Sequence, residues 1–200
     1  MMKTKTAIAT IDFLWALVAF LVIITAILFA ANHDLSKGNI VDKAEFVAIL
    51  EWPESNTSDL DLWVRNPMNN TIYFRNRDEG LVTLDHDDTG GTYNIVIGPE
   101  GKKIESSLRR EVTSIRGIIP GKFIIDTMLY KLDGITPVPA KVQVIKLNPY
   151  QVIAEKNIIL KTKGEDQTIV SFNVNPDGSV SEIDTDTQYN LSQQFITHTQ

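Results

Sequence analysis

The sequence predicts a single N-terminal transmembrane helix followed by a mainly-β domain, an antiparallel immunoglobulin-like β-sandwich. Three observations predict it. An apolar run holds a single charged residue, alternating apolar residues recur after residue 45, and glycine and proline turn signals separate them. The expected parts are a cytoplasmic N-terminus at 1–6, the transmembrane helix at 7–31, a linker at 32–44, the β-sandwich at 45–184 and a polar tail at 185–200.

The composition excludes several classes of site and partner. The chain has no cysteine, which excludes disulfides, thiolate metal sites and a cysteine nucleophile. Its net charge is −6, and nearly all of the acidic residues follow the apolar run. An acidic domain repels phosphates, so nucleic acid is not an expected partner.

The apolar run at residues 7–31 is long enough to cross a bilayer, since about 20 helical residues suffice. Lys3 and Lys5 precede it, so the positive-inside rule places the N-terminus in the cytoplasm. We therefore expect a single-pass protein of the inner membrane with a periplasmic C-terminal domain. The alternative is a cleaved signal peptide, but its apolar core is typically only about 7–15 residues long and carries no acid.

Asp12 is the one charged residue within the apolar run. A carboxylate in the bilayer core costs about 2.5–3.5 kcal/mol on insertion scales, which suggests a function. The alternative is that Asp12 lies near the cytoplasmic headgroups. Helical spacing places Asp12 on a stripe of mostly small residues that favours close helix packing, namely Ala9, Ala16, Ala19, Ile23, Ala26 and Ala30.

The short basic N-terminus and the segment Ile11-Asp-Phe-Leu-Trp-Ala-Leu-Val-Ala-Phe20 resemble the B subunits of ion-driven motors, the MotB/ExbD/TolR-like proteins. The resemblance covers residues 5–31. It implies that Asp12 is the carboxylate that carries a translocated H⁺, or alternatively Na⁺. It also implies a homodimer inside a pentamer of polytopic MotA/ExbB/TolQ-like A subunits, driven by the proton motive force.

Beyond the apolar run, period-2 alternation of apolar residues predicts strands, and pairs such as Gly90-Gly91 and Pro120-Gly121 separate them. Many short strands with such spacing are typical of an antiparallel sandwich. The predicted strands are 45–52, 60–64, 71–75, 92–97, 122–132, 140–147, 152–160 and 167–174.

The segments Ser58-Asp-Leu-Asp-Leu-Trp-Val64 and Leu84-Asp-His-Asp-Asp-Thr-Gly-Gly91 resemble a poorly characterised group of bacterial sandwich domains, the DUF2135-like domains. The resemblance spans about residues 45–175. It implies the fold and no particular activity.

Two clusters of carboxylates follow within these segments, and carboxylate oxygens are the ligands that calcium prefers. They comprise Asp59, Asp61, Asp85, Asp87 and Asp88. Period 2 places Asp59 and Asp61 on one face of a strand. The alternative is that these acids cap turns and pair with Arg65, Arg75 or Arg77.

The sequence leaves three functions open, none of them enzymatic, because its three histidines are scattered and no catalytic motif is present. The first is a motor B subunit whose sandwich transmits force outside the membrane. The second is a membrane-tethered binding module for calcium or glycan, with the helix as a simple anchor. The third is a structural subunit in which Asp12 pairs with a basic residue of a partner helix.

Overall fold

The computed structural model describes residues 12–27, 43–91 and 94–196. The chain divides into two units, residues 1–41 and 42–200. In the first, residues 12–27 form a helix. Among the described residues, no helix is both long enough and apolar enough to cross a membrane. The predicted transmembrane segment includes residues 7–11 and 28–31, which lie outside the described residues.

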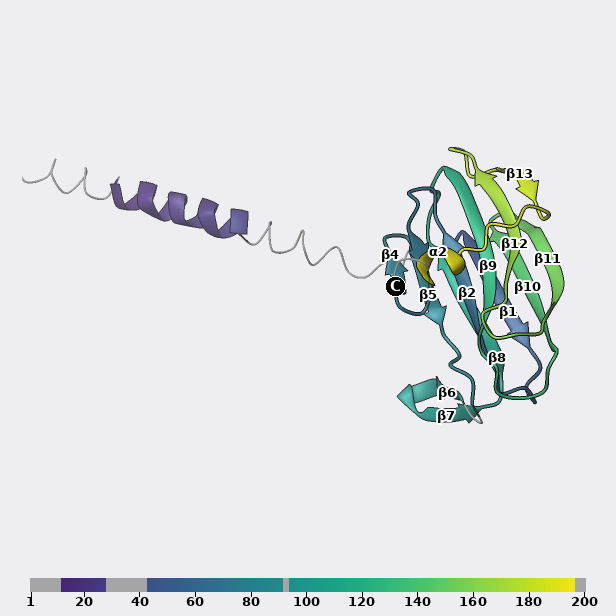
Figure 1. The fold of residues 1–200 in the computed structure, drawn as a ribbon. Coiled ribbons are helices and arrows are strands. Elements are labelled where there is room, and N and C mark those ends of the chain that lie inside the picture. Colours follow the sequence, from purple (N-terminus) through teal and green to yellow (C-terminus); the bar gives the residue numbers. More distant parts are fainter. Residues whose placement is uncertain (1–11, 28–42, 92–93, 197–200) are drawn as a thin grey trace, which may run out of the picture. The chain divides into compact units, whose positions relative to one another are not determined.

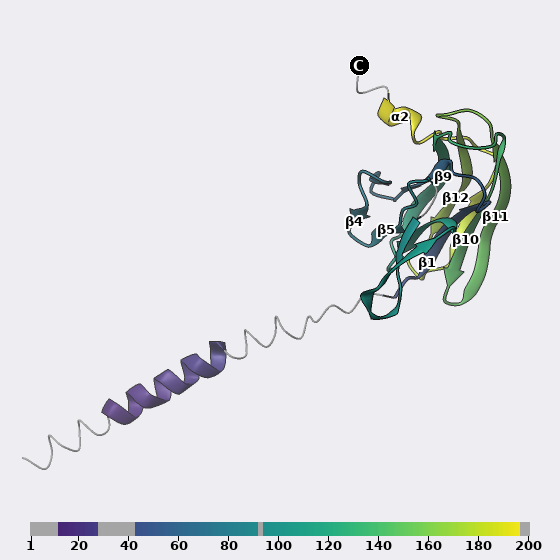
Figure 2. The same ribbon diagram turned by 90° about the horizontal axis from the view of Figure 1, so that it is seen from below.

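The second unit is an antiparallel sandwich of two β-sheets, which confirms the mainly-β part of the predicted fold class (Figures 1 and 2). The first sheet has the order β11-β10-β1-β8-β5-β4, formed by Tyr150–Leu160, Val138–Leu147, Phe46–Trp52, Arg109–Ile115, Val82–His86 and Asp78–Glu79. The second has the order β13-β12-β9-β2-β3, formed by Val180–Asp184, Asp166–Val174, Gly121–Lys131, Asp59–Arg65 and Thr71–Ile72. A separate ribbon pairs β6 (Asn94–Ile97) with β7 (Lys103–Ser106).

Alternation of side chains explains how β1 joins the first sheet to the core. Phe46, Ala48, Leu50 and Trp52 are buried, whereas the residues between them are half-buried. Since successive side chains of a strand point to opposite faces, one face of β1 packs between the sheets. The strand pairs with β8 on one side and β10 on the other.

The core between the sheets is built around three phenylalanines. The Phe172 ring lies 6.1 Å from Phe46 and 5.6 Å from Phe123, measured between ring centroids. These residues come from β12, β1 and β9, so the contact joins both sheets. A smaller apolar cluster of Trp63, Ile124, Met128 and Leu191 lies apart from this core.

The structure contains each predicted strand, although β3 is shorter than expected. It adds β4, β5, β7, β8 and β13, which alternation does not predict. In β8 the buried face carries Arg109, Glu111 and Thr113 and only one apolar residue, Ile115, so it gives no apolar alternation. Part of the expected polar tail packs on the sandwich, because Leu191 is fully buried there and Gln193–Ile196 form the short helix α2.

We expect residues 43–200 to fold alone, with Phe172→Ala destabilising them by about 3–5 kcal/mol, because the substitution leaves a cavity between the sheets. Urea unfolding followed by circular dichroism measures this. Tyr150→Ala is the matched control, since its side chain is 69% exposed, and it should change the free energy of unfolding by less than about 0.5 kcal/mol. Equal effects of the two substitutions would contradict the assigned core.

Candidate cation site

The helix of residues 12–27 carries five of the seven predicted helix-face residues. Asp12, Ala16, Ala19, Ile23 and Ala26 are all exposed within the described unit. A helical repeat of 3.6 residues places them along one stripe. The remaining two, Ala9 and Ala30, lie outside the described residues.

Asp59 and Asp61 occupy one face of β2. They alternate with Leu60 and Leu62, which are fully buried between the sheets. The two aspartates are nevertheless buried as well, being only 7% and 2% exposed. The predicted pairing of these carboxylates on one strand face therefore occurs, and it occurs away from bulk solvent.

Glu111 joins the two aspartates from the other sheet. It lies on β8, and one of its oxygens, Oε2, accepts a hydrogen bond of 2.6 Å from the backbone N–H of Leu62. The Leu62 amide has no partner on β3, because β3 pairs with β2 only at Val64 and Arg65. One oxygen each from Asp59, Asp61 and Glu111 lies within 4.8 Å of the other two.

Each member of this cluster has one buried oxygen without a hydrogen-bond partner. These atoms are Oδ1 of Asp59, Oδ2 of Asp61 and Oε1 of Glu111. Within the described part of the chain, no lysine or arginine forms an ion pair with any of the three. Buried charges in proteins are ordinarily paired or coordinate metals, so the three carboxyls in their charged form require a positive partner.

The segment after β5 brings a fourth carboxylate to the cluster. Asp87 forms an ion pair with Arg77 at 3.3 Å, as one interpretation of the sequence expects, and it also faces Glu111 closely enough to raise the pKa of that group. Asp85 pairs with Arg116 at 2.5 Å near the surface.

A buried ion pair fixes this segment in place. Asp88 is fully buried and receives a bond of 3.1 Å from Arg109, which is 1% exposed. Gly90 adopts a φ of +71°, and a Cβ atom there would lie 2.7 Å from the Thr57 carbonyl oxygen. Only glycine allows the segment to pass this close to the beginning of β2.

Electrostatics in the cluster favour the uncharged carboxyls in the absence of a cation. Burial, with further repulsion from Asp87 and Asp88, raises the pKa of Asp59 to about 7. Burial and repulsion from Asp59 raise the pKa of Asp61 to about 8. The pKa of Glu111 is raised well above its usual value, again by burial first and then by Asp61.

Such a cluster can hold either protons or a divalent cation. Calcium takes six to eight oxygen ligands at about 2.3–2.6 Å, so oxygens on one ion lie at most about 5 Å apart. The cluster satisfies this spacing. The sequence singled out Asp59, Asp61 and Asp87 but not Glu111, which lies about 50 positions later on a strand with no apolar alternation.

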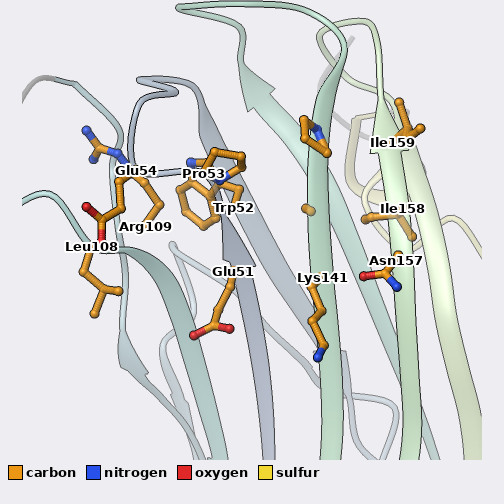
Figure 3. A pocket seen from close by; sticks show the side chains of 12 residues that line it. Glu51, Trp52, Pro53, Glu54, Leu108, Arg109, Lys141, Asn157, Ile158 and Ile159 are labelled. Atoms are coloured by element: carbon orange, nitrogen blue, oxygen red, sulfur yellow. The ribbon is translucent and has the colours of Figure 1, made fainter.

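A hollow against the first sheet offers no comparable site. It has a volume of about 630 Å³ and is lined by residues of β1, β8, β10 and β11, including Trp52 and Ile158 (Figure 3). Its charged residues already have partners. Glu51 pairs with Arg110, and Lys141 pairs with Glu155 at 3.0 Å.

Comparisons with known proteins leave the family open. No protein family matches the chain, and no curated protein matches it. One solved structure, described as "Crystal structure of unknown function protein SAV2460", has a TM-score of 0.47 and 14% sequence identity. The alignment covers 74% of this chain and 91% of the other. That protein is described as being of unknown function, so the similarity assigns none here.

In EDTA, the free energy of unfolding should fall as the pH rises from about 5 to about 9, by up to about 1.4 kcal/mol per pH unit for each carboxyl that keeps its proton in the folded state. In the folded protein Asp59 and Asp61 keep their protons until pH 7 to 8, whereas in the unfolded chain they release them near pH 4. The stabilisation that these two carboxyls contribute is therefore complete below pH 4 and is lost as the pH rises through 7 to 8. Asp126, whose pKa burial raises to about 8, adds to the trend. Urea titrations across this range measure it. Glu111→Gln should flatten the profile, and stability that rises with pH would contradict the assignment.

Arg109→Met should destabilise the sandwich by about 3–5 kcal/mol, because Asp88 would remain buried without its partner. Its neighbour Arg110 provides the control. Arg110→Met breaks a partly exposed pair with Glu51 and should cost less than about 1 kcal/mol. Thermal unfolding of the two variants compares these costs, and similar losses would contradict the role given to the buried pair.

Proposed function

We propose that this chain is a membrane-tethered protein whose β-sandwich lies outside the membrane and binds calcium. The observation that carries the proposal is the buried cluster of Asp59, Asp61 and Glu111, in which one oxygen of each residue lies within 4.8 Å of the others and each residue holds a buried oxygen without a hydrogen-bond partner. A tether is supported by the apolar run at residues 7–31 and the basic residues before it. We also propose that the β-sandwich that follows the apolar run has an immunoglobulin-like strand order.

The ligand set favours calcium over transition metals. All of the groups that converge are carboxylates, and neither cysteine nor histidine is a member of the cluster. Hard oxygen donors suit calcium, magnesium and manganese, whereas zinc and copper prefer nitrogen and sulfur. Calcium tolerates irregular geometry, whereas magnesium demands a near-ideal octahedron. Modules outside the cytoplasm typically bind calcium with dissociation constants of about 10⁻⁴–10⁻³ M.

Isothermal titration of the full-length chain in detergent should show one calcium ion per chain in this affinity range, with weaker binding of magnesium. Protons should be released on binding, because the cation replaces them on carboxyls whose pKa values lie near 7 and 8. The measured enthalpy should therefore depend on the ionisation enthalpy of the buffer.

Glu111→Gln should weaken calcium binding at least tenfold. The matched control is Asp85→Asn, which removes a carboxylate of the same sequence cluster that is engaged with Arg116. It should leave the affinity within twofold. No calcium binding by the wild-type chain, or equal losses in both variants, would refute the proposal.

A second candidate function is that of the B subunit of an ion-driven motor. One observation favours it: Asp12 lies on the helix of residues 12–27, on which Ala16, Ala19, Ile23 and Ala26 share its face. Small residues allow helices to approach closely in a bilayer, so this face suits a partner helix. Under this proposal Asp12 carries H⁺ or Na⁺, two copies sit within a ring of polytopic A subunits, and the sandwich transmits force.

Asp12→Asn separates the candidate functions, because it keeps the size of the side chain and removes its ionisation. The motor proposal expects co-purification with a polytopic partner together with complete loss of ion-driven activity. A simple anchor expects no loss, since a bilayer penalty of about 2.5–3.5 kcal/mol is removed. Ala7→Ser, a small polar change in the same run, is the control. Normal activity of the Asn variant would exclude the motor.

A further inference from the structure

A second cavity lies against the second sheet, among the aromatic residues of the smaller apolar cluster. It has a volume of about 390 Å³. Its walls come from β2, β9, the segment after β3, the turn between β11 and β12, and the C-terminal segment that includes α2. Pockets for small ligands typically measure about 300–1,000 Å³, so this volume suits a ligand of one or a few rings.

Five aromatic residues line this aromatic pocket. Trp63 and Tyr73 stack with their ring centroids 4.2 Å apart and their planes 14° apart. Phe74 lies 4.9 Å from Tyr130, and Phe195 of α2 lies 5.6 Å from Trp63. Tyr130 and Phe195 remain 38% and 40% exposed. Flat apolar surfaces of this kind suit ligands that present a face of C–H groups or a ring.

Polar groups at the pocket add a charge preference. The guanidinium of Arg75 lies over the Phe74 ring, 5.3 Å from its centroid, and the side chain itself is exposed. Lys163 enters from the turn between β11 and β12. Cationic residues from two different elements therefore border one pocket, and an arginine fork matches a carboxylate in geometry.

Trp63 supplies a further polar group. Its side chain is 3% exposed, and its indole N–H is buried without a hydrogen-bond partner. An orphaned donor costs free energy in the ligand-free protein, because it has lost its hydrogen bonds to water without gaining another. A ligand that brings an acceptor to Trp63 would remove this cost.

The wall formed by the C-terminal segment is fixed by two aspartates. The N–H of Leu191 donates to Oδ2 of Asp126 at 2.9 Å, and the N–H of Ser192 donates to Oδ2 of Asp166 at 2.9 Å. Asp126 is fully buried and receives further bonds from Thr127 and Thr168. These bonds hold the turn that precedes Phe195, so the pocket is a formed part of the fold.

We infer that the aromatic pocket binds an acidic sugar, a pyranose that carries a carboxylate. Its C–H faces would pack on the aromatic rings, its carboxylate would lie between Arg75 and Lys163, and a ring or hydroxyl oxygen would accept from Trp63. A neutral sugar would form no ion pair with Arg75 or Lys163. A proline-rich peptide would pack on the aromatic rings but would likewise form no ion pair with these two residues. The inference is independent of the calcium site and extends the proposed binding function to a second ligand.

The test is titration calorimetry with the full-length chain in a detergent without a sugar headgroup. EDTA is included, so that failure of the calcium proposal does not affect the result. The probes are the hyaluronan tetrasaccharide, which contains glucuronate, its neutral counterpart N-acetylchitotetraose, and a decaproline peptide. We expect the acidic tetrasaccharide to bind at least tenfold more tightly than either alternative and to change tryptophan fluorescence.

Arg75→Gln and Tyr130→Ala should each weaken binding of the acidic tetrasaccharide at least fivefold. Both side chains are exposed, so neither change should unfold the domain. Tyr150→Ala, at an exposed tyrosine of β11 outside the pocket lining, should leave the affinity unchanged. Absence of binding, equal affinity for the neutral sugar, or preference for the proline peptide would each overturn the inference.

Discussion

The ion pair between Arg109 and Asp88 organises the cation site. Both side chains are almost completely removed from solvent, so each depends on the other for its charge to be tolerated. The pair ties the segment after β5 to β8. It thereby sets Gly90 against the beginning of β2 and brings Asp87 towards Glu111. Loss of this one contact would free the segment that holds Asp87 near Glu111.

The two ends of β2 have opposite characters, and this difference separates the two proposed sites. Near its start, Asp59 and Asp61 face a carboxylate from the other sheet. Near its end, Trp63 faces aromatic residues and the C-terminal segment. A strand carries both sets on one face because its side chains repeat every two residues. Three successive odd-numbered positions of β2, namely 59, 61 and 63, thus serve two chemistries, while the even-numbered positions fill the core.

The sequence predicts strands reliably where one face is apolar, as in β1 and β10. It does not predict β8, because Arg109, Glu111 and Thr113 occupy its buried face and erase the alternation. For the same reason it does not predict Glu111 as a ligand. The spacing of Asp59 and Asp61 does predict their common face. The separate roles of Asp85 and Asp88 depend on Arg116 and Arg109, whose proximity only the tertiary fold creates.

The hydrogen bonds from Leu191 and Ser192 to Asp126 and Asp166 have a consequence for biosynthesis. Chains are made from the N-terminus, and domains begin to fold as they emerge. Trp63 of β2 is made early, Asp126 and Asp166 follow with β9 and β12, and Phe195 emerges only after every strand of the sandwich. The aromatic pocket can therefore acquire its last wall only after the rest of the domain has been synthesised. A chain that ends prematurely near residue 185 would retain all of its strands and lack this wall.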